Sequence, residues 1–219
     1  MIENTVLYLD NHVLAASKPV GWLTQPSGTN RKKNFEDELK KWLKVKLNKP
    51  GNVYLQSIHR IDKDVGGAVL FATSSKALSR LNEAMRNGDV GKTYHALTKK
   101  RMPLDRGRLE HWLAHGDHKA LLTAQHKENA KRAILDYTVL RKIEGSWLVE
   151  IRLHTGRYHQ IRAQLSAVGC PIVGDAKYGS DKKFTGIALH SRILSFPHPT
   201  KGEVITVTSA YPDSWPKLV

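Results

Sequence analysis

Short runs rich in apolar residues, bounded by polar turns, dominate the first part of the chain and predict strands. The first two runs are Thr5–Leu9 and Val13–Ser17, which a three-residue polar turn separates. Val53–His59, Ala68–Ala72 and Val90–Thr98 have the same character. We therefore predict that much of the sheet is built from strands that follow one another closely along the chain.

Helical periodicity appears in two other segments of this part. Apolar residues recur every three or four positions from Phe35 to Leu47, with Asn34 placed to cap the helix and a Pro-Gly pair beyond its end. Ser74–Asn87 shows a similar apolar face, with Ser74 at the N-cap position and Gly88 at the end.

The second half of the chain carries further predicted elements. They are a hairpin of Ala133–Lys142 with Trp147–Leu153, a helix over Tyr158–Val168, and two late strands over Ile187–Phe196 and Glu203–Ala210. Lys99–Lys131 shows no clear periodicity, and we expect loop there. Because strands and helices do not alternate regularly, we predict an α+β fold with a mixed, largely antiparallel sheet flanked by helices and loops, in a single domain over residues 1–219.

The charge balance changes this picture of an ordinary globular protein. The chain of 219 residues has 35 Lys and Arg against 20 Asp and Glu, a formal net charge of +15 with histidine neutral. Such an excess favours a polyanionic partner, and nucleic acid is the commonest one. The alternative, a protein kept soluble by its charge, explains an excess of this size less well.

The single cysteine and the lack of long apolar runs indicate a compartment. Cys170 excludes an intrachain disulfide and a multi-cysteine metal site, and we interpret it as a small packed residue. No apolar run approaches the roughly 18 residues of a membrane helix, and the N-terminus lacks the pattern of a signal peptide. We expect a cytoplasmic protein that does not enter the membrane.

One carboxylate stands out in the segment Ser57–Gly67. Asp62 lies between Arg60 and Lys63, and two glycines close the segment. A lone Asp in a turn usually caps that turn. Here neighbouring cations would keep the carboxylate ionised, and flanking strands would hold it rigidly. We therefore treat Asp62 as a candidate catalytic group.

Two other segments carry candidate binding residues. In His154–Gln164, Gly156 lies between a predicted strand and a predicted helix, and Arg157 and Arg162 add charge where helix N–H groups would attract an anion. Alone, this segment could equally be a solvated basic helix start. Tyr94 could stack on a base or pack in the core.

Taken in order, these segments resemble the RluA-type family of RNA pseudouridine synthases. The family motif His-Arg-Leu-Asp, two residues, Thr-Ser-Gly corresponds to His59–Gly67, where Val65 and Gly66 replace Thr and Ser. The other matches are Lys18–Gly21 to Lys-Pro-x-Gly, Lys92–Ala96 to Lys-x-Tyr-x-Ala, Gly156–Arg162 to Gly-Arg-x-His-Gln-Ile-Arg, and the later elements Ile172–Asp175, Tyr178-Gly179, Ala188–His190 and Phe196–Pro199. The resemblance covers the catalytic domain only, and we expect no accessory S4-type RNA-binding domain.

The resemblance implies a reaction and a set of roles. A pseudouridine synthase isomerises uridines of structured ribosomal or transfer RNA, with no cofactor and no metal. Asp62 would be the catalytic carboxylate, paired with Arg162, and Tyr94 would stack on the base and could transfer a proton. Arg60 would fill the space that the extruded base leaves. We predict RNA contacts for Arg60, His59, Lys18, Lys92, Arg157, His159 and Gln160, in a monomeric protein.

Several alternatives stay open. Asp62 could attack the sugar, attack the base or abstract a sugar proton, and Asp64 is its nearest rival. A non-catalytic RNA-binding or RNA-chaperone module would share the fold. A metal-dependent nuclease would need clustered carboxylates, which the chain does not show. His111, His115 and His118 have spacings that could suggest a metal site, but we favour an RNA-facing or solvated loop.

Overall fold

The computed structural model describes residues 2–27, 33–181, 184 and 186–216. The chain forms two compact units. The first unit comprises Met1–Gly91 and Ser191–Tyr211, and the second comprises Lys92–His190 and Pro212–Val219. Among the described residues, no helix is long and apolar enough to cross a membrane.

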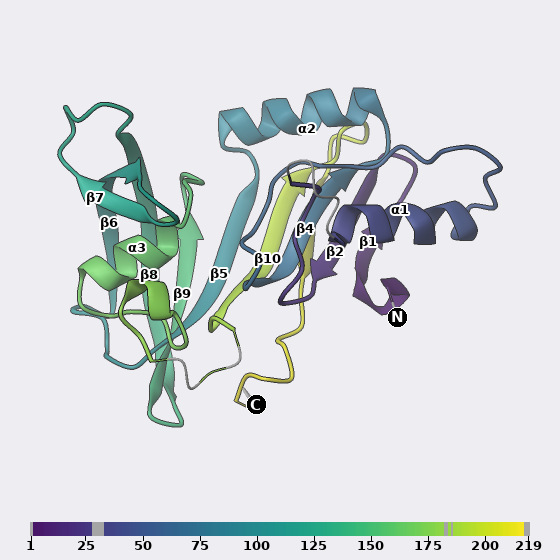
Figure 1. The fold of residues 1–219 in the computed structure, drawn as a ribbon. Coiled ribbons are helices and arrows are strands. Elements are labelled where there is room, and N and C mark those ends of the chain that lie inside the picture. Colours follow the sequence, from purple (N-terminus) through teal and green to yellow (C-terminus); the bar gives the residue numbers. More distant parts are fainter. Residues whose placement is uncertain (1, 28–32, 182–183, 185, 217–219) are drawn as a thin grey trace. The chain divides into compact units, whose positions relative to one another are not determined.

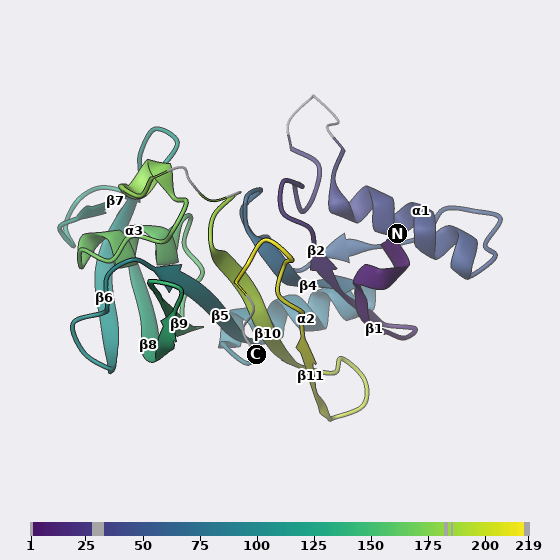
Figure 2. The ribbon, with the colours of Figure 1, turned by 90° about the horizontal axis from the view of Figure 1, so that it is seen from below.

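The sheet of the first unit follows the order β1-β2-β4-β10-β11, with β3 also paired to β4. Its strands are β1 (Val6–Leu9), β2 (Val13–Lys18), β3 (Gln56–Ser57), β4 (Gly66–Ala72), β10 (Leu189–Pro197) and β11 (Val204–Thr208). The β1–β2, β2–β4 and β10–β11 ladders are antiparallel, and Figure 2 shows the β10–β11 hairpin with its connecting loop. The predicted α+β class and largely antiparallel pairing are confirmed.

The helices of the first unit begin where the sequence predicts. Helix α1 (Phe35–Lys46) follows Asn34, whose side chain accepts a hydrogen bond from the backbone N–H of Asp37 at 3.0 Å. Helix α2 (Ser75–Asn87) follows the Ser74 cap and ends at Gly88, which adopts the left-handed conformation that glycine tolerates. A short 3₁₀ helix, η1 (Ile2–Thr5), precedes β1.

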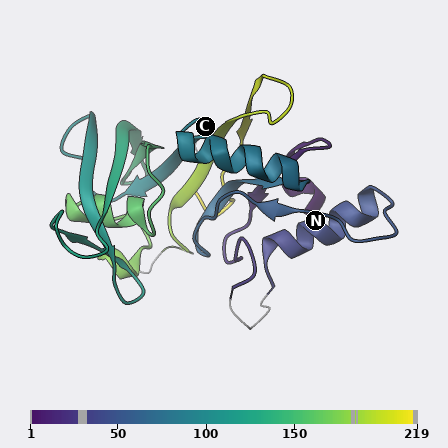
Figure 3. The same ribbon diagram turned by 90° about the horizontal axis from the view of Figure 1, so that it is seen from above.

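The core of the first unit lies between α2 and the sheet. Figures 1 and 3 show α2 lying across one face of the strands. The fully buried members of this cluster come from α2, β2, β4, β10 and β11: Val13, Ala15, Ala68, Leu70, Ala72, Ala77, Leu81, Ala84, Leu194, Phe196 and Val207, together with Val90. Burial of this apolar surface holds β4 rigidly, and the Asp62 segment leads directly into β4.

The second unit is an antiparallel sheet covered by a short helix. Its strand order is β5-β9-β8-β6-β7. The elements are β5 (Gly91–Thr98), β6 (Arg106–His115), β7 (Ala120–Thr123), β8 (Lys131–Ile143), β9 (Ser146–Leu153), α3 (Gln160–Ala167) and the 3₁₀ helix η2 (Ala176–Tyr178). A small cluster of Leu113, Ala120, Ala133, Ala163 and Tyr178 joins α3 and η2 to strands β6, β7 and β8.

Two predictions of secondary structure were wrong. Of the strand expected over Val53–His59, only Gln56–Ser57 forms a strand paired with β4, and beyond it the N–H of Ile58 still donates to the Leu70 carbonyl oxygen. The N–H of Ser57 donates to a Glu36 carboxylate oxygen, and the N–H of Leu70 donates to His59 Nε2. In Lys99–Lys131, where we expected loop, the structure has β6 and β7. Strand β6 is held by pairing with β8, and β7 by pairing with β6, rather than by apolar periodicity of their own.

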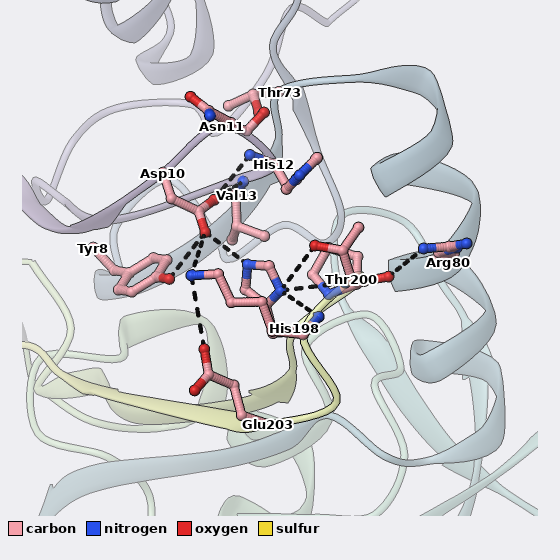
Figure 4. A network of polar contacts seen from close by, with 12 residues as sticks. Tyr8, Asp10, Asn11, His12, Val13, Thr73, Arg80, His198, Thr200 and Glu203 are labelled. Carbon is pink, nitrogen blue, oxygen red and sulfur yellow. Dashed lines mark hydrogen bonds and ion pairs between the residues drawn. The ribbon is translucent and has the colours of Figure 1, made fainter.

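A polar network ties the β1–β2 turn to the β10–β11 loop (Figure 4). Asp10 accepts hydrogen bonds from the N–H groups of His12 and Val13, from the Tyr8 hydroxyl and from His198 Nε2, the last at 2.6 Å. His198 Nδ1 accepts from the N–H groups of Thr200 and Lys201, so its hydrogen is on Nε2. Burial alone would raise the pKa of Asp10, but these hydrogen bonds hold the pKa well below its usual value.

This network predicts a pH-dependent contribution to stability. A carboxyl group whose pKa is lowered by folding stabilises the fold above its unfolded pKa, about 3.9, and loses this contribution as the pH falls through the folded value. We therefore expect Asp10→Asn to lower the free energy of unfolding at pH 7 and to differ progressively less from the wild type below pH 4. Urea unfolding at several pH values measures this. A difference that stays constant with pH would contradict the assignment.

Candidate active site

The Asp62 loop lies between β3 and β4 and is anchored on both sides of the carboxylate. Ile61 and Val65 are buried, whereas Asp62 is half-buried and Arg60 is exposed. The N–H of Val65 donates to the Asp62 carbonyl oxygen at 3.1 Å, which closes a turn around the loop. Buried neighbours thus fix the backbone while the Asp62 side chain remains accessible to a substrate.

Lys18 holds this loop from the inside. Its side chain is buried, and its ammonium donates to the carbonyl oxygens of Pro19, Trp22 and Lys63, the last at 3.2 Å. The N–H of Gly21 donates to the same Lys63 carbonyl at 2.8 Å. The Lys-Pro-x-Gly element therefore clamps the residue next to Asp62. These bonds favour a positioning role for Lys18 over the direct RNA contact that we predicted.

Lys18 also interacts electrostatically with the carboxylates of the loop. Burial lowers the pKa of Lys18 to about 7, and the nearby carboxylates of Asp62 and Asp64 oppose this shift by favouring the charged form. The ammonium therefore lies close enough to both carboxylates to interact with them. This interaction links the Lys-Pro-x-Gly element electrostatically to the candidate catalytic group.

The end of the loop explains why position 67 is a glycine and where the two replacements in the family motif lie. Gly67 has φ +116°, and a Cβ there would lie 2.3 Å from the Ser191 carbonyl oxygen, so only glycine fits. Val65 is 2% exposed, so the apolar side chain that replaces the family's Thr packs into the core. Gly66 begins β4. The replacements therefore fall on the buried side of the loop.

Arg162, from α3 in the second unit, lies in a buried ion pair. Its Nε and Nη2 donate to the two carboxylate oxygens of Asp175 at 2.7 and 2.8 Å, and the two side chains are 5% and 1% exposed. Its Nη1 contacts His159 Nε2 at 2.8 Å, and its guanidinium lies over the Tyr178 ring. A guanidinium held by two parallel bonds has a fixed orientation.

His159 connects this arginine to a row of aromatic rings. His159 Nδ1 contacts the Tyr178 hydroxyl at 3.1 Å, and its ring stacks on Tyr158, which in turn stacks on His115. The Tyr178 hydroxyl also accepts from the N–H of Ala120 and donates to its carbonyl oxygen. Burial raises the pKa of Tyr178 to about 12, so its hydroxyl stays protonated and keeps these bonds.

The start of α3 differs from our expectation. The helix begins at Gln160 rather than at Tyr158, because His159 adopts a left-handed conformation with φ 50°. The side-chain Oε1 of Gln160 accepts from the N–H of Arg157 and from the Thr155 hydroxyl, and its Nε2 donates to the Ile134 carbonyl oxygen. Gln160 therefore organises this loop.

Tyr94 and Lys92 lie on β5 in the second unit. Tyr94 pairs with Ile151 of β9 and is 6% exposed. Burial lowers the pKa of Lys92, and a Cβ on Gly156 would lie 3.7 Å from Lys92 Nζ. The Lys92 ammonium therefore lies beside the loop that Gln160 organises. Arg157 is exposed, and its Nε donates to the Arg132 carbonyl oxygen.

The predicted site residues thus form two groups, one in each unit. The first unit holds Lys18, His59, Arg60 and Asp62, and the second holds Tyr94, Lys92, Arg157, His159, Gln160 and Arg162. Sequence reasoning assigned no role to Asp175, Tyr178 or Thr24. Asp175 and Tyr178 lie in segments that match the family motifs, and this match was the signal that could have identified them. The sequence gives no such signal for Thr24, whose hydroxyl forms hydrogen bonds with both the N–H and the carbonyl oxygen of Ile61.

Two of the candidate histidines lie in a strand, and the candidate cysteine lies in the packed interior. His111 and His115 lie on β6, not in the loop that we expected, and His111 Nδ1 contacts the Gln164 amide nitrogen. The described part of the chain contains no group of three His, Cys, Asp or Glu that could hold a metal ion. Cys170 is 3% exposed, in keeping with a packed residue.

Comparison with known proteins decides the family. The family model of RNA pseudouridylate synthase matches residues 12–167, a stretch that includes the Asp62 loop and the start of α3. This chain belongs to that family. It is therefore an RNA-modifying isomerase, and the non-catalytic alternative is not favoured.

Individual relatives agree with this assignment. The RNA pseudouridine synthase YlyB of Bacillus subtilis is 30% identical over 216 residues, which cover 98% of this chain and 71% of the relative. Ribosomal large subunit pseudouridine synthase D of Zymomonas mobilis is 28% identical over 94% of this chain and 69% of its own. tRNA pseudouridine synthase C of Yersinia pestis is 26% identical over 98% of this chain and 89% of its own.

Solved structures support the fold of this pseudouridine synthase. Human RNA Pseudouridylate Synthase Domain Containing 4 superposes with a TM-score of 0.82 at 24% identity, over 97% of this chain and 90% of that one. Human RNA Pseudouridylate Synthase Domain Containing 1 superposes with a TM-score of 0.75. At this level of identity the likeness concerns the fold alone.

Proposed function

We propose that this pseudouridine synthase isomerises uridines of ribosomal or transfer RNA and that Asp62 is its catalytic carboxylate. The observation that carries the proposal is the Asp62 loop. A half-buried carboxylate lies between two buried anchors, on a backbone that Lys18 and Gly21 hold through the Lys63 carbonyl oxygen. A catalytic group needs such a fixed position together with access to the substrate.

The reaction rearranges one nucleotide without adding or removing atoms. The bond between the uracil N1 and the sugar C1′ breaks, the base turns, and a new bond forms between C5 and C1′, while the C5 hydrogen is replaced by one on N1. Asp62 serves by attack on the sugar, by attack on the base or by proton abstraction from the sugar, and each route needs the ionised carboxylate. We propose that Arg162 pairs with Asp62 during the reaction and favours this charged form.

The remaining residues are assigned to base and backbone recognition. In this proposal Tyr94 stacks on the target base and Arg60 occupies the space from which the base is extruded, since a stacked target must leave its helix. Lys92, Arg157, His159 and Gln160 lie in or beside the loop before α3 and would contact the RNA strand. The net charge of +15 supports phosphate contacts.

The names of two relatives indicate which classes of RNA to propose as substrates. One is named for the large ribosomal subunit and another for tRNA. We therefore propose that this protein acts in the cytoplasm, as a monomer, on a uridine in a stem-loop of one or both RNA classes.

Unmodified transcripts test this function directly. We expect the purified protein, in the presence of a metal chelator, to convert uridine into pseudouridine in a transcript of large-subunit ribosomal RNA or in a pool of tRNA transcripts, because the proposed chemistry uses only protein side chains. Mass spectrometry of nuclease digests identifies the product and its position. Absence of pseudouridine from both transcripts, while RNA binding is retained, would overturn the proposal.

A further inference from the structure

A groove of about 390 Å³ lies on the first unit, apart from the residues assigned above. Residues before α1, from α1 itself and from the segment around β3 line it: Gln25, Pro26, Glu36, Lys40, Val53, Tyr54, Leu55 and Gln56. Its volume is within the range of small-ligand sites and suits a single planar ring system with a few polar contacts.

The groove lies close to the Asp62 loop along the chain. The Thr24 hydroxyl donates to the Ile61 carbonyl oxygen and accepts from the Ile61 N–H, which places Thr24 against Ile61. Gln25 follows Thr24 and Asp62 follows Ile61, so the Cα atoms of Gln25 and Asp62 lie within roughly 15 Å of each other. A strand of RNA that presents a uridine to Asp62 can therefore reach the groove with a neighbouring nucleotide.

The polar side chains of the groove are oriented so that they offer donors. The Gln25 amide oxygen accepts from the Ser57 hydroxyl at 2.7 Å, and the Gln56 amide oxygen accepts from the Tyr54 hydroxyl at 3.2 Å. These two bonds fix both amide groups, and each amide nitrogen is left to donate to a ligand. Tyr54 is 41% exposed and provides an aromatic face.

The charges of the groove indicate a neutral ligand. Among the described residues that line the groove, the charged side chains are those of Glu36 and Lys40, which pair at 2.8 Å, and Glu36 also accepts from the N–H of Ser57. These described lining residues have no net charge, unlike those of a phosphate site, which would gather cations. A neutral, flat ligand with exposed acceptor atoms fits an aromatic face flanked by amide donors.

We propose that this groove binds one unpaired nucleobase of the RNA substrate, near the uridine on which Asp62 acts. The base stacks on Tyr54, and its carbonyl or ring-nitrogen acceptors receive the N–H groups of Gln25 and Gln56. The inference rests on the proposed function, to which it adds a recognition site outside the family motifs. The groove would contribute to the choice of sequence beside the target uridine.

Binding of tetranucleotides without uridine tests the site independently of catalysis. We expect oligoadenylate or oligocytidylate of four nucleotides to shift the side-chain amide signals of Gln25 and Gln56 in NMR spectra of the whole protein. Tyr54→Ala should weaken this binding about 5-fold or more, because stacking on an aromatic side chain contributes about 1–3 kcal/mol per base. Tyr54→Phe, which keeps the ring but loses the hydrogen bond to Gln56, should weaken this binding less than Tyr54→Ala. Equal shifts with inorganic phosphate alone would overturn the proposal.

Kinetics on the RNA substrate provide the second test. Tyr54→Ala and Gln56→Ala should raise KM about 5-fold or more with kcat unchanged, since the groove binds substrate without touching the reacting atoms. Val45→Ala, an exposed residue on α1 outside the groove, is the matched control and should leave KM unchanged. An unchanged KM in Tyr54→Ala, or a fall in kcat alone, would refute the site.

The two proposals can fail separately. A wild-type protein that makes no pseudouridine but binds tetranucleotides at Gln25 and Gln56 would refute the proposed function and retain the groove as a nucleotide site. An active wild type without these NMR shifts would refute the groove alone.

Discussion

Asp62→Asn is expected to lower the rate of pseudouridine formation on the order of 10³-fold or more, with RNA binding retained. The amide is nearly the same size as the carboxylate, so the anchors at Ile61 and Val65 and the bonds to the Lys63 carbonyl oxygen can remain. The amide, however, has no charge and is a poor nucleophile and base. Product formation under single-turnover conditions, together with RNA binding by filter retention, measures the two effects.

Asp64→Asn is the matched control for this prediction. Asp64 lies in the same loop, and its carboxylate also acts on the buried Lys18 ammonium. If loss of one negative charge near Lys18 were sufficient to inactivate the enzyme, both variants would be equally impaired. We expect Asp64→Asn to retain most of the wild-type activity. Equal product from wild type and Asp62→Asn would remove Asp62 from the mechanism.

Asp175→Ala is expected to destabilise the fold by about 3–5 kcal/mol, because it removes a buried carboxylate that binds the buried Arg162 guanidinium. The two bonds at 2.7 and 2.8 Å are lost together. Urea unfolding followed by tryptophan fluorescence gives the change in free energy. Asp175→Asn, which keeps one acceptor oxygen, should lose less.

The ion pair of Glu110 with Arg132 provides the control for this buried pair. Their side chains are 43% and 54% exposed, so solvent screens the interaction and can replace it. Glu110→Gln should therefore change stability much less than Asp175→Ala. Similar losses for both variants would show that burial does not set the importance of the Arg162–Asp175 pair.

The elements that the sequence predicted well are those with local signals. Asn34 and Ser74 cap helices as expected, and Gly88 ends α2, because these residues satisfy helix ends through groups a few positions away. The hairpin of β8 and β9 also followed from a local turn between apolar runs. Strands β6 and β7 were missed, since the stability of β6 comes from pairing with β8, and that of β7 from pairing with β6, rather than from a pattern within them.

In the candidate site, too, some residues could be predicted from the sequence and others could not. The motif order was sufficient to select Asp62, Tyr94 and Arg162 and to predict the family, which the comparison confirmed. The residues that hold them in place could not be predicted from the sequence. Nothing in the spacing indicates that Asp175, thirteen positions after Arg162, holds its guanidinium, or that Thr24 bonds the backbone beside Asp62.

The sequence by itself determined the candidate residues for the proposed chemistry, the caps of α1 and α2, and the family. Only the tertiary structure decided how these residues are held: the Lys18 ammonium is directed to three carbonyl oxygens of its own surroundings, and Arg162 is bound by Asp175. The physical reason is burial. Burying a charged group without a partner costs free energy, so buried charged groups have partners. The partners come from positions that only the completed fold brings together.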